Sequence, residues 1–444
     1  MTTYRAVDTA LFTDLYELTM AAAYHAEGMA AEVVSFELFV RSLPEARNFL
    51  VACGLDDVLA YVEGLRFDEA AIGYLRTLDL FDDGFLAALG SLRFTGDVHA
   101  IPEGEVVFAG EPLVRVTAPL IEAQLLETFL INALATQTMI ASKAARVALA
   151  CGDRSFVDFS ARRDHGTSAA MAAARAAFVG GAGGTSLVEA GRRYGLSLSG
   201  TMAHSYVMAF DDEVEAFRAY ARRFPGHAVL LLDTYDTLEG ARRTVEVAKE
   251  HPVSAVRLDS GDLGSLAVDV RRILDDGGFA GIRLFASGDL DEYRIAELLG
   301  AGAPIDAFGV GTRLGTSADA PSLGMVYKLV EDAGGPRMKL AEGKRSVPGR
   351  KQVWRRADGD VLALEGEDVP GGRPLLVEAV RSGRRVLPAE PLAAARDRRA
   401  TAVGALPDRL RSLAPATPEW PVELSRDLSA LADQLSLALS DGAD

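Results

Sequence analysis

Short apolar runs alternate with helix-length segments through the middle of the chain. Apolar runs of strand length occupy 155–159, 229–232, 254–258, 282–286 and 307–310. Segments with helical character lie between them, at 168–178, 237–250, 263–274 and 290–299. Strands that recur about every 25 residues with helices between them indicate parallel βα units, because parallel neighbours need a long crossover connection.

Two α/β architectures fit this alternation, an open doubly wound sheet and a closed barrel. No glycine-rich dinucleotide fingerprint follows the first strand, and polar residues follow many of the strands rather than one or two. Catalytic groups at the carboxyl ends of many strands are typical of a barrel. The pattern therefore favours a barrel.

The two ends of the chain have a different character. Residues 1–120 mix helices and strands, with alternating apolar positions at Val34, Phe36, Leu38 and Val40 that predict a half-buried strand. A long helical stretch follows at 121–149, with a break expected near 135–136. After about 325 the chain returns to strand-like pieces, and it ends in a helix. We therefore divide the chain into 1–120, 121–324 and 325–444.

Composition narrows the classes of function. The 444 residues carry a net charge of −17, which disfavours general binding of nucleic acid or of an anionic membrane. Two cysteines exclude a disulfide framework and a cysteine-rich zinc site. The chain shows no signal-peptide pattern and no uncharged apolar run near the roughly 18–20 residues of a membrane span. We expect a cytoplasmic protein without nucleic-acid or membrane partners.

Two glycine turns follow consecutive late strands, in a position where barrels often hold a phosphate. They are Ser287-Gly288-Asp289 and Gly309-Val310-Gly311-Thr312. Glycine lets backbone N–H groups approach a phosphate closely, and a following helix N-terminus adds partial positive charge. The alternative interpretation is a pair of tight turns that only require positive φ.

One histidine and two acidic strand ends are candidates for catalysis. His204 lies among small residues after a short apolar run at 197–199, and Asp233 and Asp259 directly follow apolar strands. An imidazole can carry a proton or a phosphoryl group, and carboxylates can hold Mg²⁺ or bind sugar hydroxyls. The alternative for His204 is a core histidine whose hydrogen bonds are satisfied within the protein. The alternative for the aspartates is that they cap helix N-termini, above all Asp236 and Asp262. Arg162 is a candidate for binding an anion.

Together these segments resemble the nicotinate phosphoribosyltransferase family. The resemblance covers roughly the first 355 residues in family order, through motifs at 13–16, 159–166, 200–205, 232–236, 257–263, 286–289, 308–312 and 343–353. It implies a type II phosphoribosyltransferase fold, in which an irregular, incomplete α/β barrel packs against an α+β domain built from both chain ends. It also implies homodimers with active sites at the subunit interface.

The family reaction joins nicotinate to 5-phosphoribosyl 1-pyrophosphate and gives nicotinate mononucleotide and pyrophosphate, a step of NAD salvage. The resemblance implies that ATP hydrolysis is coupled to this reaction through a phosphorylated histidine, with Mg²⁺ present. His204 matches that histidine, and Asp233 or Asp259 would hydrogen-bond its other ring nitrogen and fix its tautomer. The protein ligands of Mg²⁺ are left open.

The resemblance also assigns the remaining site residues. The 5′-phosphate would be held by the two glycine turns, at Ser287, Gly288, Asp289, Gly309, Gly311 and Thr312. Arg162 and Arg257 would line the pyridine and pyrophosphate region. Tyr16 matches a tyrosine that stacks on the pyridine ring, supplied by the neighbouring subunit.

Substrate choice is inferred from Ser186. Relatives that use nicotinamide carry an acidic residue at the matching position, where a carboxylate would repel nicotinate. Ser186 is neutral and can donate a hydrogen bond, so the sequence indicates nicotinate.

Three alternatives stay open at this point. One is a related phosphoribosyltransferase that uses nicotinamide. A second is another sugar-phosphate barrel, an aldolase or isomerase, although no strand end here carries the lysine of an aldolase. The third is a non-catalytic sugar-phosphate sensor with the same fold. Loss of His204 or of an acidic strand end would indicate such a sensor, and this sequence retains both.

Overall fold

A computed structural model describes residues 10–341 and 346–441. The chain forms two compact units. Unit 1 holds the residues up to Met139 together with those from Ser322 onward, and unit 2 holds Ile140–Pro321. The first border differs from the division at 120 that the sequence suggested, because one helix, α6 (Glu127–Cys151), runs continuously from unit 1 into unit 2. The second border, after Pro321, lies close to the suggested division at 324.

The break expected near 135–136 is therefore wrong. Neither residue is glycine or proline, and the chain stays helical through both. The real interruption lies at Leu125–Leu126, between the short helix α5 (Leu120–Gln124) and α6.

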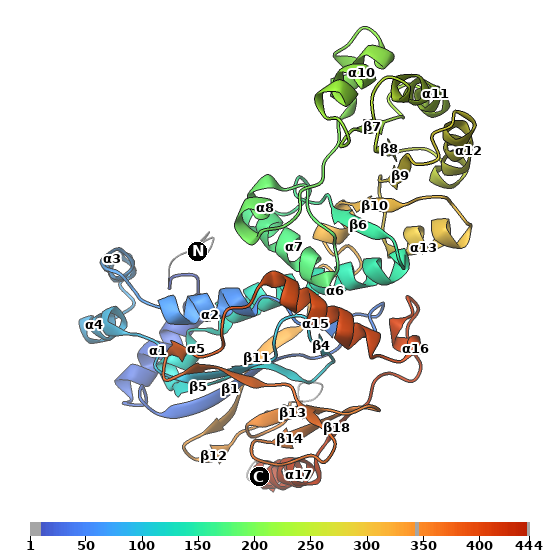
Figure 1. The fold of residues 1–444 in the computed structure, drawn as a ribbon. Helices are drawn as coiled ribbons and strands as arrows, with labels where there is room; N and C mark the ends of the chain where they lie inside the picture. The colour runs from blue at the N-terminus through green and yellow to red at the C-terminus, as the bar shows by residue number, and fades with distance from the viewer. Residues whose placement is uncertain (1–9, 342–345, 442–444) are drawn as a thin grey trace. The chain divides into compact units, whose positions relative to one another are not determined.

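Strands from both chain ends share the main sheet of unit 1, as the resemblance implied. The sheet is antiparallel in every pairing, and its strand order is β12-β11-β1-β5-β3-β16-β17. Figure 1 shows orange β11 beside blue β1. The strands are β1 (Val33–Val40), β3 (Asp97–Ala100), β5 (Pro112–Pro119), β11 (Met325–Asp332), β12 (Gly335–Pro336), β16 (Val377–Arg381) and β17 (Arg384–Arg385).

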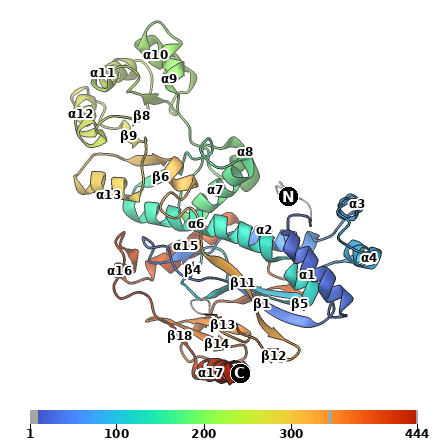
Figure 2. The same ribbon diagram turned by 180° about the vertical axis from the view of Figure 1, so that it is seen from behind.

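Two smaller sheets and a set of helices complete unit 1. The C-terminal helix α17 (Arg426–Asp441) packs on β14 (Asp360–Leu364), which Figure 2 shows from behind. The other small strands are β2 (Leu50–Val51), β4 (Val106–Val107), β13 (Lys351–Arg355), β15 (Arg373–Pro374) and β18 (Val422–Leu424). The other helices are α1 (Leu15–Ala26), α2 (Leu55–Gly64), α3 (Glu69–Thr77), α4 (Asp83–Ser91), α15 (Leu392–Gly404) and α16 (Asp408–Arg411).

Unit 2 is built on a five-stranded parallel sheet of order β6-β10-β9-β8-β7. The strands are β6 (Ser155–Asp158), β7 (Val229–Leu231), β8 (Ala255–Leu258), β9 (Arg283–Ala286) and β10 (Ala307–Val310). Parallel bridges from Asp158 to Thr185 and from Thr185 to Leu198 continue the sheet past β6. Within the described residues no pairing joins Leu198 to β7, so the barrel is incomplete.

The helices of unit 2 are amphipathic and are capped by aspartates. On α12 the buried positions Leu263, Ala267, Val270 and Leu274 repeat at helical spacing and form one apolar face. Asp236 and Asp262 accept from backbone N–H groups at the starts of α11 and α12, so the N-cap interpretation of both is confirmed. The helices are α7 (Thr167–Gly180), α8 (Val188–Tyr194), α9 (His204–Met208), α10 (Glu213–Arg223), α11 (Thr237–Ala248), α12 (Leu263–Asp276), α13 (Glu292–Gly300) and α14 (Thr312–Gly315).

None of the helices in the described ranges combines the length and apolar character that crossing a membrane requires.

The core of the parallel sheet predicts a stability test. Leu284 lies on β9 and is fully buried, so Leu284→Ala removes apolar contacts and leaves a cavity. We expect a loss of about 2–5 kcal/mol in the free energy of unfolding, measured by urea denaturation. Val268→Ala is the control, because Val268 on α12 is 54% exposed. Equal unfolding midpoints for the two variants would contradict this packing.

Candidate active site

The carboxyl ends of the five parallel strands bring the predicted site residues of unit 2 to one edge. In sheet order, the residues at or just after these ends are Asp158, Gly311, Ser287, Asp259 and Asp233. Because parallel strands all point the same way, residues far apart in sequence become neighbours at this edge. The parallel topology therefore brings polar groups from different βα units together at one edge of the sheet.

Arg257 connects three segments at this edge. Its guanidinium donates from Nε to Ser287 Oγ (2.7 Å), from one terminal nitrogen to Thr201 Oγ1 (3.1 Å) and from the other to Asp259 Oδ1 (2.6 Å). The guanidinium carbon also lies 5.5 Å from the ring centroid of Phe159, within cation–π range. These contacts fix the planar donor fork and leave the side chain 11% exposed.

Asp259 is held in its charged form. Burial acts to raise the pKa of this carboxyl group, but the hydroxyl of Ser287, the guanidinium of Arg257 and the positive field of His204 together lower it below its ordinary value. The Ser287 hydroxyl donates to the same Oδ1 that Arg257 binds. Among the described residues only Oδ1 takes part in these hydrogen bonds, so Oδ2 is available to accept from a ligand.

His204 begins α9 and is half-buried. Its Nδ1 lies 3.2 Å from Thr234 Oγ1. The expected hydrogen bond to Asp233 or Asp259 is therefore wrong for this structure. Asp259 Oδ1 is already bound by Arg257 and Ser287, and the hydroxyl of Thr234 occupies the position at Nδ1.

The segment that carries His204 also spans the open side of the barrel. Thr201 contacts Arg257 on β8, and His204 contacts Thr234 just after β7. These two side-chain contacts attach the segment to strand ends with which it forms no sheet pairing. They place the imidazole at the same edge as the two aspartates.

Asp233 has one satisfied and one free carboxylate oxygen. Ser260 Oγ donates to Oδ2. Oδ1 is buried and has no hydrogen-bond partner among the described residues. An unpaired buried carboxylate oxygen is costly, so it fits a site completed by a cation or a bound water.

The two glycine turns have geometries that only glycine accepts. Gly288 has φ of 94°, and an added Cβ would lie 2.0 Å from the carbonyl oxygen of Asp259. At Gly309 a Cβ would lie 2.7 Å from the ring of Phe159. Asp289 also has positive φ, at 48°. The turn therefore contains two consecutive residues in the left-handed region, Gly288 and Asp289.

These turns offer unpaired donors. Within the described part of the chain, the amides of Gly288, Asp289, Gly311 and Thr312 donate to no protein acceptor. Gly288, Asp289 and Thr312 are exposed, whereas Gly309 is buried and serves packing against Phe159. The single turn of α14 is too short to act through a helix dipole, so its contribution is the amides themselves.

Asp158 organises the side of the edge that carries Arg162 and Ser186. It is fully buried, and it accepts from the amide (2.9 Å) and hydroxyl (2.6 Å) of Ser160 and from Thr185 Oγ1 (2.8 Å). Burial raises its pKa although these three donors act to lower it. Its carbonyl also accepts from the Ser186 amide (2.9 Å).

Sequence reasoning did not include Asp158 among the site residues. The available signal was an acidic residue at the end of an apolar strand, the same signal that singled out Asp233 and Asp259. Arg162 and Ser186 themselves are exposed, with side chains available to a ligand.

Tyr16 is the one predicted site residue that lies in unit 1. It is 48% exposed on α1, beside the exposed Leu15. Its neighbour Glu17 is fully buried, and burial raises the pKa of Glu17 to about 7 despite hydrogen bonds from Gln124 and Tyr16. Burial, followed by the hydrogen bond with Glu17, raises the pKa of Tyr16 well above its ordinary value, so its hydroxyl stays protonated at neutral pH.

The fold and the site define a class of protein. An incomplete parallel barrel with free backbone amides on late strand ends, joined to an α+β unit built from both chain ends, is a type II phosphoribosyltransferase fold. The chain superposes on human nicotinic acid phosphoribosyltransferase with a TM-score of 0.85 at 28% identity, covering 95% of this chain and 99% of that one. A nicotinate-nucleotide pyrophosphorylase from Pyrococcus furiosus shares the fold with a TM-score of 0.77 at 24% identity, over 91% and 97% of the chains.

The chain belongs to the nicotinate phosphoribosyltransferase family. Residues 11–135 match the nicotinate phosphoribosyltransferase (NAPRTase) N-terminal domain. The chain is 51% identical over 426 residues to nicotinate phosphoribosyltransferase pncB2 of Mycobacterium tuberculosis, covering 94% of this chain and 91% of the relative. It is 42% identical over 377 residues to the Bacillus subtilis nicotinate phosphoribosyltransferase, covering 81% and 77%.

The Gly288 turn predicts a binding test. Gly288→Ala places a methyl group against the Asp259 carbonyl in a backbone conformation that alanine disfavours, so the turn must shift. We expect affinity for ribose 5-phosphate, measured by calorimetry, to fall at least about tenfold, the loss of roughly one charge-assisted hydrogen bond. The matched control is Gly281→Ala, where a Cβ meets nothing within 4 Å. Unchanged affinity in Gly288→Ala would show that phosphate binds elsewhere.

Proposed function

We propose that this chain joins nicotinate to 5-phosphoribosyl 1-pyrophosphate and releases nicotinate mononucleotide and pyrophosphate. In this reaction the bond from C1′ to the pyrophosphate oxygen breaks, and a bond from C1′ to the pyridine nitrogen forms. The observation that carries the proposal is the single sheet edge that holds two turns with free amides, the Arg257–Asp259–Ser287 cluster and His204. Family membership supports the substrates.

The two glycine turns are suited to the 5′-phosphate. Their free amides are neutral donors, which do not change the net charge of the site, and neither turn needs a cationic side chain. This matters because a net charge of −17 repels polyphosphates at long range. Local donors at short range overcome that field, since salt screens it beyond roughly 8–10 Å.

The remaining substrate groups fit the other side chains at the edge. The free Oδ2 of Asp259 can accept from a ribose hydroxyl, while Arg257 compensates the carboxylate charge. Arg162, exposed beyond β6, can bind a carboxylate or phosphate through two parallel hydrogen bonds. Ser186, exposed near the same strand end, adds a neutral donor for the nicotinate carboxylate.

We propose that Mg²⁺ acts with the pyrophosphate group and that Asp233 helps to hold it. The buried, unpaired Oδ1 of Asp233 is the observation that fits a cation. The described residues contain no cluster of three or more potential metal ligands. This suits Mg²⁺, which commonly takes one or two carboxylates and completes its shell with water and substrate phosphates. Bound there, Mg²⁺ would neutralise charge on the leaving pyrophosphate.

We also propose that ATP hydrolysis is coupled to the transfer through His204. An imidazole nitrogen would attack the γ-phosphorus of ATP, the bond to the β,γ-bridging oxygen would break, and ADP would leave. Water would later cleave the P–N bond and release phosphate. The position of His204 supports this proposal, because Thr234 orients the ring at the edge where the pyrophosphate would lie. Added charge on a phosphohistidine would favour the productive state of the Mg²⁺-loaded site.

We propose that the working form is a homodimer with shared active sites. Tyr16 supports this, because an aromatic side chain 48% exposed beside exposed Leu15 is suited to an interface. From a second copy, its ring would stack on the pyridine of the substrate. The direct test of the whole function is pyrophosphate release from nicotinate and 5-phosphoribosyl 1-pyrophosphate, with and without ATP. No release under either condition would end the proposal.

His204→Ala separates the coupled step from the transfer. We expect the variant to lose ATP hydrolysis and acid-labile phosphoenzyme, and to use 5-phosphoribosyl 1-pyrophosphate poorly, with residual transfer at high substrate concentration. The control is His227→Ala, because His227 is an exposed histidine of the same unit. The measurement is phosphoenzyme formed from γ-labelled ATP; label retained by His204→Ala would refute the assignment.

Ser186→Asp tests the choice between nicotinate and nicotinamide. A carboxylate at this exposed position would repel the carboxylate of nicotinate and accept from the amide of nicotinamide. We expect the ratio of kcat/KM for nicotinate to that for nicotinamide to fall by about tenfold or more, equivalent to roughly 1.4 kcal/mol. The control is Ser186→Asn, because asparagine has nearly the same shape as aspartate without its charge. It should change the ratio less. Equal ratios in both variants would show that Ser186 does not face this substrate group.

A further inference from the structure

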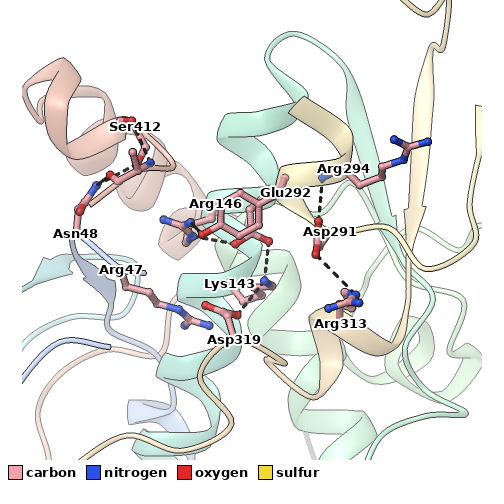
Figure 3. A network of polar contacts seen from close by, with 12 residues as sticks. Arg47, Asn48, Lys143, Arg146, Asp291, Glu292, Arg294, Arg313, Asp319 and Ser412 are labelled. Atoms are coloured by element: carbon pink, nitrogen blue, oxygen red, sulfur yellow. Dashed lines mark hydrogen bonds and ion pairs between the residues drawn. The ribbon is translucent and has the colours of Figure 1, made fainter. Parts of the chain in front are cut away.

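A buried ion network lies in unit 2 outside the residues assigned to substrate. Lys143 Nζ on α6 lies 2.6 Å from Glu292 Oε2 and 2.8 Å from Asp319 Oδ1 (Figure 3). Arg146, one turn further along α6, binds the other oxygen of Glu292 through Nε at 2.9 Å. The side chains of Lys143, Arg146 and Glu292 are at most 4% exposed, and that of Asp319 is 15% exposed.

The two acidic residues belong to the segments that follow the two glycine turns. Glu292 is the first residue of α13 and follows the Ser287–Asp289 turn by way of Leu290 and Asp291. Asp319 follows α14, which begins at Thr312 directly after Gly311. The single amine of Lys143 therefore contacts one group attached to each turn.

The connection between Asp319 and its turn is fixed by backbone hydrogen bonds. After α14, the amide of Ala318 donates to Arg313 O (3.1 Å) and that of Ala320 donates to Ser317 O (2.8 Å). A displacement of Asp319 would therefore be transmitted to α14.

The start of α13, which carries Glu292, is fixed by a side-chain cap. The side chain of Asp291 caps this helix by accepting from the Arg294 amide (2.9 Å). Asp291 Oδ2 also lies 3.7 Å from Arg313 Nε of α14 (Figure 3). This ion pair is a second and more exposed connection between the two segments.

The network is better suited to setting geometry than to adding stability. Each of the four side chains lies against at least one opposite charge of the network. Replacing such a network with apolar side chains is often neutral for stability, whereas removing one member leaves an uncompensated buried charge. Arg146 further restricts the carboxylate of Glu292, and its terminal nitrogen donates to Tyr293 Oη at 2.8 Å.

We propose that Lys143 is a positioning residue that sets the spacing between the two phosphate-binding turns. One phosphate can bind amides from both turns only if the turns are held at a fixed separation, and preorganised donors bind without the cost of ordering them. The inference rests on the proposed function, in which these turns hold the 5′-phosphate. Lys143 touches neither substrate nor reacting atoms in this role.

The test is the charge-balanced variant Lys143→Met/Asp319→Asn. It removes the link between the two segments and leaves the Arg146–Glu292 pair intact. One cation and one anion are removed together, so the net charge is unchanged. The matched control is Arg243→Met/Glu213→Gln, which removes another ion pair of unit 2, at 2.7 Å between α11 and α10. Thermal unfolding and circular dichroism establish that both variants fold.

The measurements are KM for each substrate, kcat, and the affinity for ribose 5-phosphate by calorimetry. For Lys143→Met/Asp319→Asn we expect KM for 5-phosphoribosyl 1-pyrophosphate and the dissociation constant of ribose 5-phosphate to rise at least tenfold. We expect KM for nicotinate to change less than threefold. We expect the control to change less than threefold in every constant. This split identifies positioning of the phosphate turns, because a general loss of structure would weaken both substrates.

Three results would overturn the inference. In the first, Lys143→Met/Asp319→Asn binds ribose 5-phosphate within threefold of the parent, while Gly288→Ala loses this affinity. This result would show that the turns bind phosphate without Lys143, and the proposed function would stand. Equal losses in the two double variants would show a general effect of removing an ion pair from unit 2. If Gly288→Ala also binds ribose 5-phosphate normally, the phosphate assignment itself fails and the role of Lys143 fails with it.

Discussion

The hydrogen bonds of Arg257 are the interaction on which the candidate site depends. One guanidinium joins its own strand end to Ser287 after β9 and to Thr201 in the segment that leads to His204. An arginine can do this because its planar fork offers several donors in fixed directions. In the described structure the segment that carries His204 forms no strand pairing with β7 or β8, so side-chain contacts from Arg257 and Thr234 hold it at the site.

The parallel sheet explains why these contacts are available. Asp158, Asp233 and Asp259 lie at or just after the ends of three different strands, yet each reaches the same edge, because all the strands run in one direction. Each carboxylate is then stabilised differently. Serine and threonine donors bind Asp158, and an arginine and a serine bind Asp259. One oxygen of Asp233 has no partner among the described residues. Of these three carboxylates, Asp233 is the one with a buried oxygen that a cation can bind.

Much of the fold could be predicted from periodicity. The strands near 155–159, 254–258 and 307–310 and the helices between them appear with shifts of a residue or two, because apolar runs and aspartate caps are local signals. The interval 197–199 forms a single bridge, at Leu198, within the part of the chain that the structure describes. The first unit border could not be predicted, because α6 continues across it without a local signal.

The long-range polar contacts could not be predicted either, because no local sequence signal indicates them. The partner of His204 is Thr234, an ordinary threonine whose role depends on how the open side of the barrel is spanned. Lys143 and Glu292 are far apart in the chain, and nothing local shows that both are buried and paired.

The most direct measurement of the central claim is a crystal structure of this protein with nicotinate mononucleotide bound. The account predicts that the phosphate lies within hydrogen-bond distance of the amides of both glycine turns, that the ribose contacts Asp259, and that the imidazole of His204 faces the vacated pyrophosphate position. A nucleotide phosphate bound away from both turns, with Arg257 and His204 far from the sugar, would contradict it.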